Sequence, residues 1–258
     1  MLIILRRAVL AAALLNPCLP ASASATWSII VLDRTKGFIG VAGASCTSDV
    51  YGIMALVPGT GALMAQAIGH PPAMREALRL LRGGVAPDSV LRVITAPSVD
   101  TAIQLRQYGM ATFTGGQVQF TGTAAIDYHG ERSADGVLVQ GNTLAGPAVL
   151  DRAIAAIQQA RAAGKPMEEV IMAGLKAGSD AGGDSRCGAQ RATSAFLAVA
   201  KPGDVANWPF LTLRVVDVAR RSNVNAVELL QGRLAHWRAG GGAKNSITSE
   251  TVRPDSTD

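Results

Sequence analysis

The sequence predicts an α+β domain in which antiparallel sheets are covered by helices. Strand-like apolar runs occur in blocks joined by short turns, as in antiparallel neighbours. Two pairs of helical stretches separate these blocks instead of alternating with single strands, which favours layered sheets over a parallel sheet. The chain has 258 residues, so removing a 25-residue leader leaves 233, enough for one sizeable core.

Residues 1–25 have the pattern of a cleaved secretory leader. Arg6 and Arg7 give a positive start, residues 8–15 are apolar, and residues 23–25 (ASA) form a small-x-small cleavage pattern. The apolar run is far below the ~20 residues that span a bilayer, so stable membrane insertion is not expected. The alternative is a buried N-terminal helix. Cleavage predicts a periplasmic or secreted protein whose first residue is Thr26.

From Thr26 onward the chain is expected to form a hairpin. Residues 27–32 (WSIIVL) are strand-like, residues 33–37 (DRTKG) have turn composition, and residues 38–45 (FIGVAGAS) form a second strand rich in small residues. An amino terminus that is tied into a sheet in this way is not a loose tail.

The later elements follow from apolar periodicity and from helix-boundary residues. The expected strands are 53–57, 62–66, 102–108, 110–113, 118–120, 136–140, 194–199 and 211–216. The expected helices are 72–82, 87–93, 147–163, 166–177 and 224–239. A glycine-rich loop spans 178–188, and residues 241–258 have the composition of a disordered tail. Residues 26–240 are therefore expected to form a single domain.

Composition argues against several classes of function. The basic residues are scattered and aromatic residues are few, so nucleic-acid binding is not expected. His70, His129 and His236 form no cluster with the cysteines, and no glycine motif has phosphate-binding spacing. We therefore expect neither a metal nor an organic cofactor. A homo-oligomer is compatible with the sequence.

Cys46 and Cys187 remain when Cys18 leaves with the leader. Two cysteines in an exported chain more often form a disulfide than two free thiols. Such a bridge would draw Ser45 and Arg186 together, so that their loops share one wall of a site. In the alternative, Cys46 is a nucleophile with a free thiol.

Thr26 is the leading candidate for catalysis. A threonine hydroxyl needs a base to take its proton, and a free α-amine has a pKa of about 7.7–8.0, which suits that role. As the first residue, Thr26 would carry both groups. The alternative is that threonine stands there by accident of where the leader ends.

An ordered set of motifs covers most of the mature chain. The motifs are TWSIIVLD (26–33), GVAGASC (40–46), VPGTGALMAQA (57–67), LLRGGVAPDSVL (80–91), QGNTLAGPAVLD (140–151) and AGGDSRC (181–187). Together they resemble the DUF1028 family, placed in the N-terminal-nucleophile hydrolase superfamily. The resemblance implies a four-layer α-β-β-α sandwich of two antiparallel sheets, and hydrolysis of an amide bond or a related acyl transfer. It places the family's first threonine at the expected cut.

Asn142 is the expected donor to the oxyanion that forms when an amide is attacked. It follows a strand, its carboxamide offers two N–H groups, and Gly141 permits close approach of the backbone. The alternative is ordinary turn chemistry at a strand end.

Four other polar residues are candidates for the same site. Asp184 is expected to orient the Thr26 amine and Arg186 to bind an anionic substrate, although this pair may equally be read as a brace for the glycine-rich loop. Ser45, at the end of the second strand, is expected near the amine, and Gln66 stands at another strand end.

The sequence thus predicts an exported hydrolase of a small-molecule or peptide amide. The alternative is a secreted, non-catalytic binding or surface-assembly protein on the same fold, since some members of the family carry a pilus-assembly label.

Overall fold

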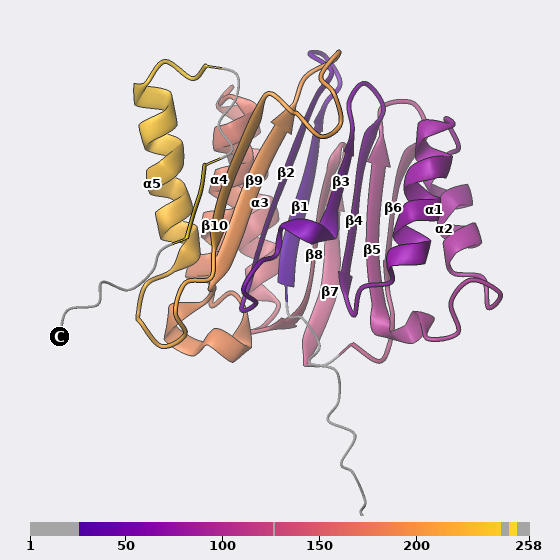
Figure 1. Cartoon of the computed structure of the whole chain (residues 1–258), viewed down its shortest axis with the longest axis horizontal. Helices are drawn as coiled ribbons and strands as arrows, with labels where there is room; N and C mark the ends of the chain where they lie inside the picture. Colours follow the sequence, from indigo (N-terminus) through magenta and orange to yellow (C-terminus); the bar gives the residue numbers. More distant parts are fainter. Residues whose placement is uncertain (1–25, 126, 244–247, 252–258) are drawn as a thin grey trace, which may run out of the picture.

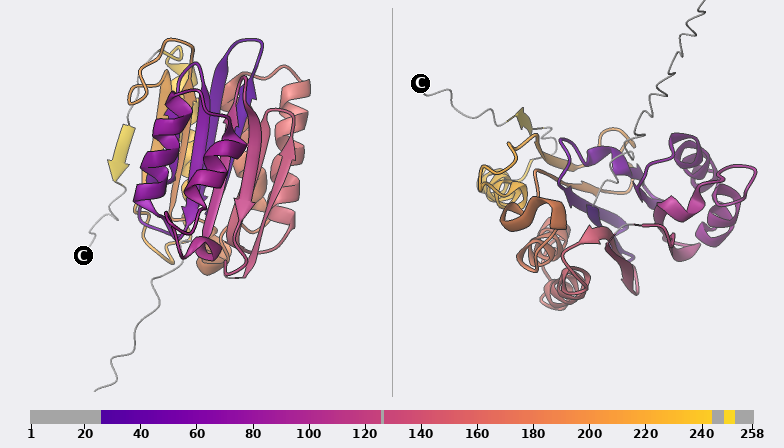
Figure 2. Two further views of the ribbon diagram at one scale, coloured as in Figure 1. Left: turned by 90° about the vertical axis from the view of Figure 1, so that its right-hand side faces the viewer. Right: turned by 90° about the horizontal axis from the view of Figure 1, so that it is seen from below.

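A computed structural model describes residues 26–125, 127–243 and 248–251 of the chain. Two sheets stack face to face, and helices cover the outer face of each (Figures 1 and 2). The predicted α+β sandwich is confirmed. The predicted leader, residues 1–25, lies outside the described residues, as does most of the predicted tail.

The larger sheet has seven strands in the order β11-β10-β9-β2-β1-β8-β7. These strands are β1 Thr26–Asp33, β2 Phe38–Ser45, β7 Tyr128–Ala134, β8 Val137–Leu144, β9 Ser194–Ala200, β10 Leu211–Val216 and β11 Thr248–Thr251. All neighbours are antiparallel except the parallel pair β10 and β11 at one edge. The expected hairpin at the start of the domain, β1 and β2, therefore forms the middle of this sheet.

The smaller sheet has four antiparallel strands in the order β3-β4-β5-β6. They are β3 Met54–Val57, β4 Gly61–Ala67, β5 Arg106–Thr112 and β6 Gly116–Thr121. The helices are α1 Pro71–Arg82, α2 Pro87–Ile94, α3 Ala148–Ala162, α4 Met167–Asp180 and α5 Ala226–Ala239, with 3-10 turns η1 Tyr51–Ile53, η2 Ile103–Leu105 and η3 Ser185–Gln190. Helices α1 and α2 cover the smaller sheet, and α3 to α5 cover the larger one.

The structure corrects three expectations about strands. Residues 102–108 and 110–113, expected as two strands, form η2 followed by the single strand β5. Strand β7 was not expected because its sequence, YHGERSA, lacks an apolar run; it lies at a sheet edge and is half-exposed. Strand β11 lies within the stretch expected to be a tail.

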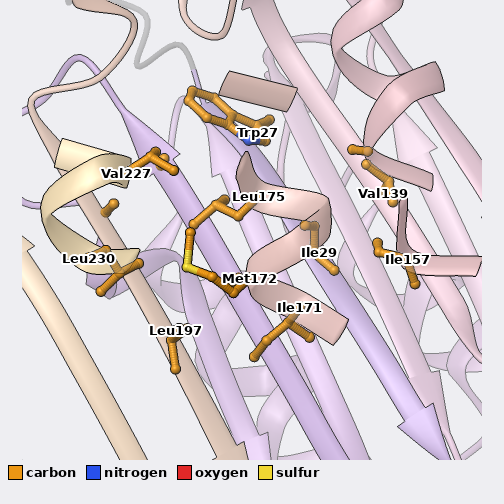
Figure 3. Close-up of a cluster of buried hydrophobic side chains, with 14 of the residues drawn as sticks. Trp27, Ile29, Val139, Ile157, Ile171, Met172, Leu175, Leu197, Val227 and Leu230 are labelled. Carbon is orange, nitrogen blue, oxygen red and sulfur yellow. The ribbon is translucent and has the colours of Figure 1, made fainter. Parts of the chain in front are cut away.

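Strand β1 is buried on both of its faces. Trp27 and Ile29 point toward the helices, where Leu175 of α4 joins the same core (Figure 3). Ile30 and Leu32 point the other way, into the core between the two sheets. Burial on both sides explains why the strand reads as a continuous apolar run. Successive side chains of a strand point to opposite faces, and Thr26 lies four residues before Ile30. Its side chain therefore faces the space between the sheets, as that of Ile30 does.

Candidate active site

Thr26 lies between Ser45 and Asn142 at one end of the larger sheet. In the antiparallel register, Thr26 pairs with Ser45 on β2 and with Asn142 on β8. Directly paired residues project on the same face, with Cβ atoms roughly 4.5–5.5 Å apart. All three are buried, with at most 1% of their surface exposed. Residues predicted separately from the sequence are therefore adjacent.

Ser194, on the neighbouring strand β9, extends the row of paired residues Asn142, Thr26 and Ser45 by one position. It was not among the residues predicted from the sequence. It pairs with Ser45, on the face of β9 that carries the inter-sheet residue Phe196. Among the described residues, the Ser194 hydroxyl is buried without a hydrogen-bond partner. Its position at the start of a strand-like run gave no hint, because only the pairing of β9 with β2 places it beside Ser45.

Gln66 reaches the row from the facing sheet. Its Nε2 donates to the main-chain oxygen of Thr26 at 3.1 Å, and its Oε1 accepts a hydrogen bond from the Ser28 hydroxyl at 2.5 Å. Gln66 is 3% exposed. The weakest of the sequence candidates is thus in direct contact with the first residue of β1.

Gln107, also missed, links this contact to Asn142. Its Oε1 accepts from Gln66 Nε2 at 2.8 Å and from Asn142 Nδ2 at 3.3 Å. Its Nε2 donates to the main-chain oxygen of Gly141 at 3.0 Å. Gln107 is fully buried, but the sequence shows only a glutamine within the expected strand 102–108, which by itself does not reveal that burial. The two glutamines fix Asn142 relative to the Thr26 backbone.

Asp184 links the end of β2 to the glycine-rich loop through hydrogen bonds. Its carboxylate is fully buried and accepts from the backbone N–H of Cys46 at 2.6 Å. Arg186 donates to the same carboxylate through its backbone N–H at 3.0 Å and its Nη2 at 2.8 Å. These contacts support the bracing alternative that the sequence left open.

The predicted disulfide between Cys46 and Cys187 is confirmed, with Cα atoms 5.7 Å apart. It joins the end of β2 to η3, and so it links the segments that carry Ser45 and Arg186. The bond removes the free thiol that a Cys46 nucleophile requires.

The glycine-rich loop also holds the end of β8. The Ser185 hydroxyl donates to the main-chain oxygen of Thr143 at 2.9 Å, and Leu144 forms a β-bridge with Asp184. Thr143 has a φ of 51°, a left-handed conformation that is uncommon for a β-branched residue. A Cβ at Gly141 would lie 3.0 Å from the Thr26 oxygen, so the expected close approach of the backbone is present.

A pocket of about 790 Å³ opens beside Thr26. Thr26 and Gln66 contribute to its base, and one face of α1 and the segment from Tyr51 to Leu56 line it. Ser45, Asn142, Asp184 and Arg186 are not among the residues that line it. The structure does not place Arg186 at this pocket, and its expected contact with a substrate remains a prediction. Gln66 does line the pocket, where a bound molecule could contact it.

His70 lies at the edge of this pocket, next to a buried ion pair. Its Nδ1 is 3.5 Å from Asp100 Oδ2, which accepts from Arg106 Nε at 2.7 Å. The Arg106 hydrogen bond lowers the pKa of Asp100 and outweighs the opposing effect of burial.

No group of three or more histidine, cysteine or acidic side chains suited to a metal occurs within residues 26–125, 127–243 and 248–251. Over the same residues, no helix combines the length and the apolar character needed to cross a membrane.

Comparison with known proteins identifies a family but no activity. The model of the "Family of unknown function (DUF1028)" matches residues 26–225. The crystal structure of protein SPO2555 from Silicibacter pomeroyi, described with the same family, has a TM-score of 0.68 and 24% sequence identity, and the match covers 89% of this chain and 99% of that one. At this identity the likeness shows the fold alone. No curated protein matches the chain.

Loss of the disulfide is expected to destabilise the domain. The bridge closes a loop with a sequence separation of 141, so replacing both cysteines with serine should lower the free energy of unfolding by about 4–5 kcal/mol in the chain-entropy model. Urea unfolding with and without dithiothreitol measures this, and the double variant serves as the control that dithiothreitol should not affect. Equal stability of the oxidised and reduced wild type would contradict the prediction.

The ion pair of Asp100 with Arg106 predicts a pH dependence of stability. Because the folded-state pKa of Asp100 is lowered, its contribution is fully present above the unfolded pKa of about 3.9 and is lost as the pH falls through the folded value. The difference in unfolding free energy between wild type and Asp100→Asn should therefore be present at about pH 5 and shrink as the pH falls below about 4. Urea titrations across this range test it, and an unchanged difference at pH 3 would refute it.

Proposed function

The chain belongs to the DUF1028 family, whose function is unknown, and from the geometry of its site we propose that it is an exported hydrolase of amide bonds. Removal of residues 1–25 would make Thr26 the first residue, with its hydroxyl as nucleophile and its α-amine as base. A small molecule or a peptide would supply the amide. This chemistry on this sandwich would place the protein in the N-terminal-nucleophile hydrolase superfamily.

One observation carries the proposal. The residue at which the family match begins, Thr26, is also the first residue of β1, lines the pocket, and lies between Ser45 and Asn142. A nucleophile needs a cavity for its substrate, and an oxyanion needs a fixed donor nearby. Thr26 has a cavity on one side and a buried carboxamide on the neighbouring strand.

The first half of the reaction would transfer the acyl group to Thr26. The hydroxyl oxygen attacks the carbonyl carbon and forms a new C–O bond, while its proton passes to the α-amine, directly or through one water. The carbonyl electron pair moves onto oxygen and then returns as the C–N bond breaks. The amine gives the proton to the departing nitrogen, which leaves as a neutral amine.

The second half would release the acyl group. Water attacks the ester carbon, the α-amine accepts one water proton, and the ester C–O bond breaks. The Thr26 oxygen regains a proton, so the products are a carboxylic acid and an amine, and the enzyme is unchanged. No oxidant, reductant or metal enters this balance.

Asn142 would stabilise the negative charge on the carbonyl oxygen. A donor that is already fixed contributes most, because it does not have to reorganise during the reaction. Asn142 is 1% exposed, and one of its N–H groups donates to Gln107. The carboxamide nitrogen carries two N–H groups, which allows a second hydrogen bond to the oxyanion.

Ser45 would hydrogen-bond the Thr26 amine, since the two residues are direct partners in the register. Asp184 would act as a positioning residue, because its carboxylate holds the Cys46 N–H beside Ser45. The disulfide supports an oxidising compartment, either the periplasm or the outside of the cell.

Substitution of Thr26 tests the nucleophile. Thr26→Ala should lower labelling by a β-lactone acylating probe by at least about 10³-fold, whereas Thr26→Ser should keep it because hydroxyl and amine both remain. The exported protein should first be examined by mass spectrometry, which should show Thr26 with an unmodified amine at its terminus.

Two outcomes would reject this mechanism. One is a mature terminus upstream of Thr26 or a blocked Thr26 amine. The other is labelling that survives Thr26→Ala with the correct terminus; in that case the non-catalytic binding or surface-assembly protein becomes the better interpretation.

Substitution of Asn142 tests the oxyanion donor. Asn142→Asp has nearly the same shape but lacks the N–H groups, so kcat should fall by about 10²–10³ with a smaller change in KM. The acylation rate of the probe gives the same ratio before a natural substrate is known. The urea unfolding midpoint controls for damage to the fold, and an unchanged acylation rate in a folded variant would exclude the role.

A further inference from the structure

We propose that the pocket beside Thr26 binds amides that carry both an apolar chain and a carboxylate, the chemical class of the N-acyl amino acids. The binding claim stands on the pocket alone; only the statement that such amides are cleaved rests on the proposed function. Three properties of the pocket lead to this class: an apolar wall, two cationic side chains without acidic partners, and its length along α1.

The apolar wall of the pocket is formed by residues from two elements, α1 and the segment that joins η1 to β3. Helix α1 contributes Met74 and Leu78, which lie one turn apart on the same face and are half-buried. Ile53, Met54 and Leu56, at η1 and in β3, also line the pocket and pack against the core between the two sheets. Apolar side chains that line an open cavity favour an apolar ligand, because contact with it removes the apolar surface of both from water.

Two cations stand on the same helix face. Arg75 and Arg82 line the pocket and are exposed, and neither forms an ion pair within the described residues. Arg79, between them, instead points to Glu76 at 2.6 Å and does not line the pocket. Arginine is suited to a carboxylate, because its guanidinium can donate two parallel hydrogen bonds.

The other charged groups of the pocket are already compensated. Arg214 pairs with Asp49 at 2.5 Å and stacks on the Tyr51 ring at 4.2 Å. His70 lies against Asp100, which Arg106 neutralises. The charge that remains for a ligand is therefore positive and comes from Arg75 and Arg82.

The spacing along α1 allows one molecule to use both features. Residues 75 and 82 are seven positions apart, which is about 10 Å along a helix. Met74 and Leu78 lie within this length, on the face that the arginines flank. A medium-length acyl chain can therefore lie on the apolar wall while the carboxylate reaches an arginine, in a pocket that Thr26 also lines.

The test is direct binding to the exported Thr26→Ala protein, which cannot consume the ligand through Thr26. Isothermal titration calorimetry would compare N-decanoylglycine with two partial ligands: N-decanoylglycinamide, which lacks the charge, and N-acetylglycine, which lacks the chain. We expect N-decanoylglycine to bind at least about tenfold more tightly than either, because it alone combines a carboxylate for an arginine with a long apolar chain for the apolar wall.

Substitution of Arg75 and Arg82 tests whether these two residues bind the carboxylate of the ligand. Arg75→Gln with Arg82→Gln should weaken N-decanoylglycine about tenfold and leave N-decanoylglycinamide unchanged, which also shows that the variant is folded. Arg79→Gln, on the same helix but outside the pocket, is the matched control and should change neither affinity.

The outcomes separate this inference from the proposed function. Equal binding of the charged and uncharged decanoyl amides, unchanged binding in the double variant, or no measurable binding of N-decanoylglycine would overturn the inference, even if the β-lactone probe labels Thr26. Selective, arginine-dependent binding without any hydrolysis by the wild-type protein would support the inference and count against the amide hydrolase.

Discussion

The placement of Thr26 depends on the antiparallel register of β1 between β2 and β8. This register gives Thr26 two direct neighbours, Ser45 and Asn142, at the edge of the space between the sheets. A slip by one residue would turn Thr26 toward the helices and Trp27 toward the other sheet. Trp27 is fully buried against α4, where Gly178 leaves room for its indole ring, so the large side chain on one face fixes the orientation of the small Thr26 side chain on the other.

The glycine-rich loop secures the two strand ends that flank Thr26. One buried carboxylate, Asp184, binds the Cys46 N–H at the end of β2, while Ser185 holds Thr143 at the end of β8. A buried charge is costly unless it is paired and hydrogen-bonded, and Arg186 meets both conditions. The disulfide adds a covalent link at the same place. The left-handed Thr143 is held by these contacts and aligns the strand that carries Asn142.

The space between the sheets changes character along its length. Toward one end it is apolar and contains residues such as Ile30, Leu32 and Ile39. Around Thr26 it is polar, with Gln66 and Gln107 hydrogen-bonded across the two sheets. The apolar end holds the sheets together, and the polar end supplies donors that are fixed because water does not compete for them. The candidate site and the apolar contacts thus lie toward opposite ends of one interface.

The sequence by itself determined the local features of this protein. Turn composition and apolar periodicity predicted the β1–β2 hairpin and most helices, and the two cysteines predicted the disulfide. The expected leader cut and the family resemblance pointed to Thr26, and the position of Asn142 after a strand pointed to its role. These signals work because they depend on residues close in the chain or on residue type alone. Only the tertiary structure decided that Gln107 and Ser194 belong beside them, that Asp184 braces a loop, and that Arg75 and Arg82 face the pocket. The physical reason is that these relations arise from strand order and from the packing of α1, which join residues far apart in the chain, and no local pattern specifies which strands become neighbours.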